Sequence, residues 1–356
     1  MSGKKNFGIT PNDLTFNWWD LTESINSIFT PATFLTYLMY SGYVKKASRR
    51  IKVDVVYGGQ TMAPFVSVGD SSPMVAKNKR EAQFIKLPMM ALKKELDFET
   101  DEMVVPGQSQ NNTSSNIISN ARDLYVGEEQ LDMKNRIIRR IEWMAAQTLN
   151  GKIVYKDKKM TIEIDFRMPE EHKQIYTGSI CWDSSGAKIF KNLNEWSKLI
   201  LTSCGYNPDV LVVGSNVGNS ILENTDVVKL LDSRNIAVGA LDLTKNYIEG
   251  ARYLGTLPGG IKLYEYIETF SDGGVTKHMI EPNSVSLIAT KAKFRRYGGP
   301  IFDKSINQVI SSEFFSKTYI PDDPGDIEYL VAKSSQITVP HQPGAVVTAK
   351  VLEGVN

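Results

Sequence analysis

Cysteine is nearly absent from this chain: Cys181 and Cys204 are the only two among 356 residues. Two cysteines cannot form a disulfide framework, and these two lack the paired spacing of a zinc site. We therefore expect two reduced, partly buried thiols and no metal centre.

Long hydrophobic runs and an excess of one charge are missing as well. Nowhere do 18 apolar residues follow one another, and the opening MSGKKNFGITPNDLTFNWWD has no apolar segment before a small-residue cleavage site. The sequence thus predicts neither a membrane span nor a standard secretion signal. With 41 basic and 40 acidic residues the net charge is +1, so any contact with nucleic acid through phosphates should be local or weak.

One glycine-containing stretch has the order strand, glycine, helix that a dinucleotide site would need. It is DVLVVGSNVGNS, in which Gly214 and Gly218 are four residues apart with no glycine at position 216. The fingerprint G-x-G-x-x-G is therefore absent. We expect an ordinary strand-to-helix turn in which Ser215 or Asn216 caps the helix.

A second stretch, GARYLGTLPGGIKLYEY, superficially resembles a phosphate-binding loop. Gly255 and Gly260 have the separation of such a loop, but Ile261 stands where the lysine belongs, Lys262 comes one place late, and a strand pattern follows. We expect a tight turn between two strands and no bound cofactor.

The titratable residues suggest no catalytic site. His172, His278 and His341 are far apart in the sequence and are expected at the surface, and none lies near a serine or cysteine in sequence. The acidic pairs Glu170-Glu171 and Asp322-Asp323 lie in proline-flanked loops, where solvated carboxylates are the usual case. The sequence predicts no catalytic, cofactor-binding or metal-binding residue, and hence no enzyme.

The sequence does contain extended elements that cannot bury themselves. Residues 20–29 and 33–42 form two short amphipathic pieces, which should dock on their own domain or on a neighbour. From Ile51 apolar residues alternate with polar ones, which predicts a long hairpin with Gly69–Pro73 at its tip. Such a hairpin is poorly stable alone and needs a surface on which to lie.

A polar loop or mobile segment is expected at residues 107–116, followed by a long helix over residues 128–150. KIVYKDKKMTIEIDF predicts a hairpin whose outer side chains face water or another subunit. Beyond Trp182 helices and strands alternate, and short strands fill the last 65 residues. The length also exceeds the ~250–300 residues of a single core, so more than one packed unit is expected.

These segments together resemble the lambda-type phage major capsid protein family, the "E" family of tailed bacteriophages. The segments that carry the resemblance occur in the family's order: DLTESINSI, IKVDVVYGGQTMAPFVSVG, KLPMMALKKEL, RIIRRIEWMAAQTLNGKIVY, TIEIDF, PDVLVVGSNV, GARYLGTLPGGIKLYEY, MIEPNSVSLIA and DIEYLVAKSSQITVPHQPGAVVTAKV. The loops at 108–119 and 269–277 do not align by pattern.

The resemblance implies an α+β fold of the HK97 type, in which an arm and an extended E-loop reach over neighbouring subunits. The implied parts are an N-terminal arm (1–50), an E-loop and its return (51–116), a P-domain with spine helix and hairpin (117–177), an A-domain (178–290), and P-domain C-terminal strands (291–356). On a neighbour, the E-loop could bury Phe65, Val66, Phe84 and Ile85.

The implied function is that of a structural protein of the virion, assembled in the host bacterial cytoplasm into pentamers and hexamers of an icosahedral head. Its implied partners are copies of itself, portal and scaffold proteins, a possible decoration protein, and double-stranded DNA held by weak non-specific contacts. No membrane partner is expected, and no covalent cross-link through Lys77, Lys79 or Lys86. The alternatives are an encapsulin-like compartment shell and a nucleotide-binding α/β enzyme.

Overall fold

The structure is a computed structural model that describes residues 17–28, 33–56, 80–96, 115–157, 160–184, 186–224, 227, 250–304, 307–321 and 327–353. Several positions named above lie outside the described residues: the predicted hairpin tip Gly69–Pro73, Phe65 and Val66, Lys77 and Lys79, and the pair Asp322-Asp323. Lys86 is among the described residues. None of the described helices is both long and apolar enough to cross a bilayer.

The helices are α1 (Trp18–Ser27), α2 (Phe34–Met39), α3 (Ser115–Leu149), α4 (Ile189–Cys204) and α5 (Ser215–Glu223). The strands are β1 (Tyr43–Lys45), β2 (Arg50–Val56), β3 (Arg80–Lys86), β4 (Met90–Leu96), β5 (Lys152–Asp157), β6 (Met160–Asp165), β7 (Lys173–Ile175), β8 (Val210–Val213), β9 (Ala251–Leu257), β10 (Ile261–Tyr266), β11 (Thr269–Asp272), β12 (Val275–His278), β13 (Ser284–Ile288), β14 (Phe294–Gly298), β15 (Ile301–Asp303), β16 (Gln308–Ile310), β17 (Phe315–Tyr319), β18 (Glu328–Ser334), β19 (Gln336–Pro340) and β20 (Val346–Lys350).

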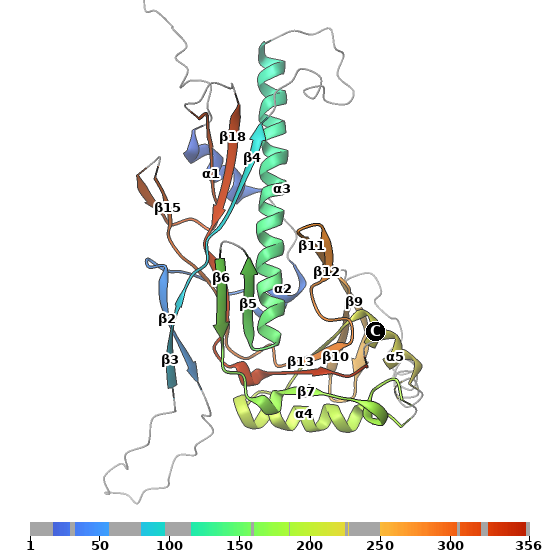
Figure 1. The fold of residues 1–356 in the computed structure, drawn as a ribbon. Coiled ribbons are helices and arrows are strands. Elements are labelled where there is room, and N and C mark those ends of the chain that lie inside the picture. The colour runs from blue at the N-terminus through green and yellow to red at the C-terminus, as the bar shows by residue number, and fades with distance from the viewer. Residues whose placement is uncertain are drawn as a thin grey trace, which may run out of the picture.

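A six-stranded sheet in the order β7-β20-β13-β8-β10-β9 forms one end of the molecule (Figure 1). Its central strands β8 and β13 are buried along their whole length, which explains their unbroken runs of apolar and small residues. Helix α4 packs against β13 and β20, and Trp196 and Ile200 on its buried face join the sheet's core. Gly205 ends α4 in the left-handed conformation that favours glycine.

The long helix α3 forms the axis of the other part, with its C-terminal end on the six-stranded sheet (Figure 1). Two three-stranded sheets, β17-β18-β4 and β1-β14-β19, pack along it. Its buried residues recur every three or four positions, as at Met133, Ile137 and Ile141, and they form a second core with strands β18 and β19. The two cores meet at the C-terminal half of α3.

Four two-stranded hairpins complete the fold: β2-β3, β5-β6, β11-β12 and β15-β16. Hairpins β2-β3 and β15-β16 lie on the side of the sheets away from α3 (Figure 1). Hairpin β5-β6 confirms the prediction for residues 152–166: Ile153 and Ile164 face the core, whereas Lys152, Glu163 and Asp165 are exposed.

Several expectations are corrected by the structure. Helix α3 begins at Ser115, thirteen residues before the predicted start at 128, so the polar stretch 107–116 ends inside the helix. The return half of the predicted long hairpin is divided, because Pro88 separates β3 from β4 and the two strands belong to different sheets. For residues 20–29 and 33–42, docking on their own domain and docking on a neighbour were both expected as alternatives, and the structure shows the first: α1 and α2 lie against α3, and α1 also lies against β17.

Candidate assembly surface

The two glycine stretches serve packing in this structure. At Gly214 a Cβ atom would lie 2.5 Å from the carbonyl oxygens of Glu281 and Pro282, and at Gly218 it would lie 2.5 Å from Oε1 of Glu265. Neither predicted side-chain cap of α5 forms: Gly214 is the N-cap, and the backbone N–H of Asn216 donates to the carbonyl of Pro282 at 3.2 Å. The turn is filled by the chain's own carbonyls.

The second stretch is the antiparallel hairpin β9-β10, which confirms the predicted tight turn between strands. Gly259 and Gly260 have φ values of 91° and 82°, a region that favours glycine. Lys262 is exposed and lies on strand β10 directly after the turn. The turn therefore leads into a strand and not into the helix N-terminus that a phosphate-binding loop needs. Among the described residues no group of three His, Cys, Asp or Glu side chains is placed to hold a metal.

The prediction of surface histidines is wrong for His172. This ring is 1% exposed; Nδ1 lies 2.8 Å from the Val346 carbonyl oxygen and Nε2 lies 2.9 Å from the hydroxyl of Ser203. Burial lowers its pKa. A Cβ on Gly344 would come 2.8 Å from that of Ser203, so the backbone at Gly344 packs closely against this half-buried serine. His278 is exposed as expected, and half-buried His341 bonds Tyr297 at 2.7 Å.

Hairpin β2-β3 has one face packed inward and one free. Ile51, Val53 and Ile85 are buried in the second core. The expectation that Ile85 is buried against a neighbouring subunit is therefore wrong. Phe84, one position earlier, is 62% exposed, with the Arg50 guanidinium 5.4 Å from its ring. Alternation along a strand thus leaves an aromatic side chain on the outer face.

A groove of about 770 Å³ lies between α3, β4, the β5-β6 hairpin and β11. Its walls are mainly apolar, and its rim holds Arg136, Arg139 and Arg140. The Arg140 guanidinium lies 5.1 Å from the ring of Trp143 and 5.0 Å from that of Tyr155. This pairing holds a positive charge over an aromatic surface. The groove could therefore receive an extended segment with apolar and acidic side chains.

A buried carboxylate fixes the arm to the body. Glu142 of α3 is fully buried and accepts the backbone N–H groups of Leu35 and Thr36, at 2.6 and 2.9 Å, at the start of α2. It also accepts the hydroxyl of Thr36 at 2.6 Å and that of Tyr266 on β10 at 2.9 Å. Burial raises the pKa of Tyr266, so this hydroxyl keeps its proton and donates. The partial positive charge at the N-terminus of α2 interacts favourably with this carboxylate.

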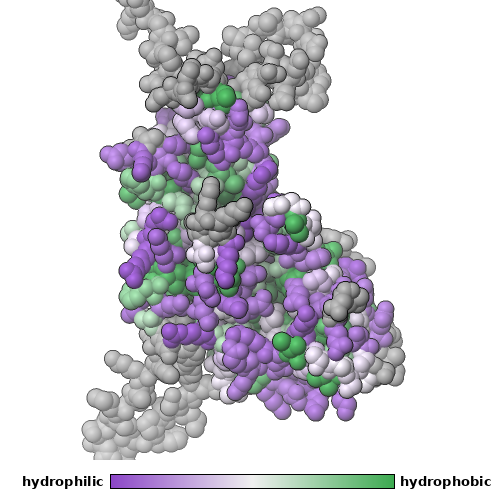
Figure 2. Space-filling model, viewed as in Figure 1, coloured by the Kyte–Doolittle hydropathy of each residue, from purple (hydrophilic) through white to green (hydrophobic). Residues whose placement is uncertain are grey.

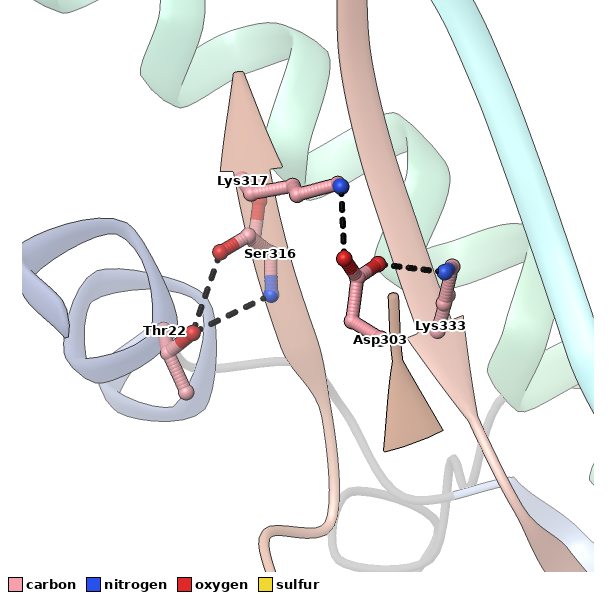
Figure 3. A network of polar contacts seen from close by, with 5 residues as sticks. All are labelled: Thr22, Asp303, Ser316, Lys317 and Lys333. Carbon is pink, nitrogen blue, oxygen red and sulfur yellow. Dashed lines mark hydrogen bonds and ion pairs between the residues drawn. The ribbon is translucent and has the colours of Figure 1, made fainter. Parts of the chain in front are cut away.

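A second buried network anchors the β15-β16 hairpin (Figure 3). Asp303, at 2% exposure, receives hydrogen bonds from Lys317 at 2.8 Å and from Lys333 at 2.6 Å. Next to it, the Thr22 hydroxyl of α1 donates to the Ser316 carbonyl at 3.0 Å and accepts the Ser316 backbone N–H at 3.2 Å. The hairpin and the arm are therefore tied to neighbouring strands of one sheet.

The outer face of the β15-β16 hairpin is apolar. Phe302 and Val309 are directly opposite each other in the ladder and are 45% and 64% exposed, whereas their neighbours Ile301 and Ile310 are buried. Most of the face in Figure 2 is polar, with separate apolar areas between the charged side chains. Exposed apolar side chains held by rigid elements are typical of protein contact surfaces.

Sequence reasoning missed Glu142, Asp303 and the groove. The hydrogen-bond partners of Glu142 are more than a hundred residues away in sequence, and Lys317, a partner of Asp303, is fourteen residues away. The groove is lined by segments between Pro88 and Ile337. Only the tertiary fold brings these residues together. A single signal was available: Glu142 is a lone acidic residue on the apolar face of a predicted helix, where a charge needs a partner.

The model of the family described as phage major capsid protein E matches residues 17–351. No curated protein matches significantly. Among solved structures, the putative capsid protein of a prophage from E. coli CFT073 superimposes with a TM-score of 0.71 at 19% identity, covering 95% of this chain and all of that chain. The capsid of cyanophage P-SCSP1u gives a TM-score of 0.49 at 10% identity, covering 92% and 90%.

Proposed function

Because this chain belongs to the phage major capsid protein E family, we propose that its copies form the pentamers and hexamers of an icosahedral head enclosing double-stranded DNA. The protein is a major capsid protein with the α+β HK97-type fold and a component of the virion. The observation that carries the proposal is the β2-β3 hairpin, whose inner face is packed on its own chain while Phe84 remains outside.

We assign the parts of the chain accordingly. Residues 1–50 form the arm, 51–116 the E-loop and its return, 117–177 the P-domain with its spine helix α3 and the β5-β6 hairpin, 178–290 the A-domain, and 291–356 the C-terminal strands of the P-domain. The two hydrophobic cores support this division, since one centres on the six-stranded sheet and the other on α3.

The role is structural and involves no catalysis. The packed glycine turns support this reading, because the space beside Gly214 and Gly218 is filled by the chain itself. The proposed partners are other copies of the chain, portal and scaffold proteins during assembly in the host cytoplasm, a decoration protein in some heads, and packaged DNA. A net charge of +1 suits a shell that contacts DNA without binding it tightly.

Two other functions make different predictions. An encapsulin-like compartment would bind a cargo peptide on its inner wall and would be encoded beside an enzyme, not beside portal, protease and terminase. A nucleotide-dependent enzyme would be stabilised by ATP or NAD, by roughly 2.7 kcal/mol at 100 times the dissociation constant. We expect no such thermal shift and no multimer ladder on denaturing gels of mature particles.

The assembly function is tested by a neighbouring pair of substitutions in β3. Phe84→Ala removes an exposed ring, so the free energy of unfolding should hardly change while shells and capsomers are lost. Ile85→Ala, the matched control, removes a buried side chain and should destabilise the chain itself by about 2–5 kcal/mol. The measurements are sedimentation velocity and negative-stain microscopy, with urea unfolding of unassembled chains.

A wild-type chain that remains monomeric at high concentration, with no shells, tubes or capsomers even beside its scaffold, would contradict the function. Unchanged assembly of the Phe84→Ala chain would contradict only the role of the hairpin.

A further inference from the structure

The spine helix α3 has an apolar stripe that the described part of the chain covers only in part. Leu124, Leu131 and Ile138 are spaced seven residues apart, which keeps them within about 40° of one another around the helix. Leu124 is 58% exposed and Leu131 36% exposed, and Ile138 is half-buried at the edge of the core. Strand β4 lies beside a different flank of α3, where Lys94 pairs with Glu129 and Asp132.

Gly127 lies one turn before Leu131 at the edge of this stripe. A glycine inside a helix costs about 1 kcal/mol relative to alanine. Nothing lies within 4 Å of a Cβ built at this position, so packing within the described chain does not require a glycine there. A close approach by another molecule would explain it.

The charges beside the stripe are separated along the helix. Asp123 and Glu128 precede Leu131, and Arg139 follows it; none of these three has an ion-pair partner among the described residues. These three side chains, two acidic ones before Leu131 and a basic one after it, can face opposite charges on a reversed copy of the helix. A parallel copy would place like charges side by side.

We propose that the stripes of two copies pair antiparallel around a two-fold axis that passes beside Leu131. This pairing rests on the proposed shell function and names a contact between capsid subunits. It sets Leu131 against the partner subunit's Leu131 and Leu124 against the partner subunit's Ile138, since each pair of numbers is symmetric about 131. The contact is isologous, because the same patch serves on both copies.

The flanking charges agree with this register. Glu128 and Arg139 lie on the same flank, about 20° apart at 3.6 residues per turn. A two-fold axis perpendicular to the helices keeps that flank facing the partner's equivalent flank. Helical side chains lean toward the N-terminus of their own helix, so in an antiparallel pair Glu128 and the partner's Arg139 lean toward each other.

The contact is small, and it suits an assembly in which many copies bind at once. Two leucines and an isoleucine per chain bury too little to hold an isolated dimer. In a shell the other subunit contacts hold the two helices near each other, so the pairing becomes effectively intramolecular. We therefore expect it in particles and not between free chains.

The first test is cross-linking of particles that carry Leu131→Cys. Because a two-fold axis brings the two new thiols together, mild oxidation should give a dimer band on a non-reducing gel. Leu124→Cys alone should stay monomeric, and particles mixed from Leu124→Cys and Ile138→Cys chains should cross-link. The unmodified chain is the control for cross-links through its own two cysteines, of which Cys181 is buried and Cys204 is half-buried.

Charge exchange is the second test. Glu128→Arg and Arg139→Glu should each lower particle yield by about tenfold, corresponding to 1.4 kcal/mol, and the double variant should recover it. Gly127→Leu should raise the melting temperature of free chains, since leucine favours the helix, and yet reduce particle yield.

Normal particles whose Leu131→Cys chains stay monomeric, or single charge variants that assemble like the unmodified chain, would overturn the pairing and leave the shell function intact. Absence of particles from the unmodified chain would instead contradict the shell function.

Discussion

The turn from β8 into α5 shows how tightly single residues are fitted in this fold. Gly214 is buried between the end of a central strand and the carbonyl oxygens of residues 281 and 282, which also accept hydrogen bonds from the backbone. A methyl group there has no space, because backbone atoms cannot move aside as a flexible side chain can.

We expect Gly214→Ala to lower the free energy of unfolding by about 1–3 kcal/mol, the usual cost of overpacking a core. Urea unfolding of unassembled chains measures it. Gly186→Ala is the matched control, because the nearest atom to its new methyl group is 3.9 Å away. Equal stability of the two variants would show that the turn relaxes at no cost.

The buried His172 makes stability depend on pH. Its pKa is lowered from the ordinary 6.5, so the unfolded chain binds the proton more tightly than the folded one. The stabilising effect of the neutral ring is complete above the unfolded pKa and is lost as the pH falls below about 6.5.

The substitution His172→Gln removes this titrating ring. The share of the stability loss below about pH 6.5 that is due to protonation of the ring should therefore disappear. The measurement is the free energy of unfolding from pH 8 to 5, compared with His278→Gln, which alters an exposed ring. If both variants follow the wild-type profile, the buried ring is not the group that titrates.

Among the elements, the β15-β16 hairpin depends most on one ionic contact. Asp303→Asn leaves Lys317 and Lys333 without their shared carboxylate in a place where water reaches them poorly. Removing one partner of a buried pair costs about 3–5 kcal/mol. We expect a loss of that order in urea unfolding, with faster amide exchange at Phe302 and Ile310.

Asp272→Asn in the β11-β12 hairpin is the control, because its ion pair with Lys277 is largely exposed. An exposed pair contributes about 0–1 kcal/mol. Losses of similar size in the two hairpins would mean that the Asp303 network is as well solvated as a surface pair.

Elements with a strong local pattern could be predicted from sequence. The alternation in 152–166, the buried run at 210–213 and the three-to-four spacing in 189–204 each gave an element of the right type. The start of α3 could not be predicted, because residues 115–127 contain Ser115, Asn116, Ser119, Asn120 and Gly127, residue types that favour a helix only weakly. His172 was placed wrongly because its two hydrogen-bond partners, at 203 and 346, are remote in sequence.

At the scale of the whole molecule, Glu142 holds together the arm, the spine helix and the six-stranded sheet. Its carboxylate accepts four hydrogen bonds from α2 and β10, and both oxygens are used. An amide in its place would turn two donors toward these groups. The arm and the sheet are therefore coupled through one side chain of the spine helix.

Glu142→Gln should lower the free energy of unfolding by about 1–3 kcal/mol, since a buried donor is left unpaired, and it should expose Leu35 and Thr36 to faster amide exchange. Glu163→Gln, on the exposed face of β6, should change neither. Unchanged exchange at Leu35 and Thr36 in the Glu142→Gln chain would mean that the arm is held elsewhere.

The order of the six-stranded sheet has a consequence for synthesis on the ribosome. Strand β20, at residues 346–350, lies between β7 and β13, so residues 173–175 join the sheet only through a strand translated about 170 residues later. Domains fold as units while the chain emerges, and this one stays open at that edge until its final strand appears. We expect a shell subunit built in this way to become competent to join its neighbours only after this strand has been translated, which would keep unfinished chains out of the particle.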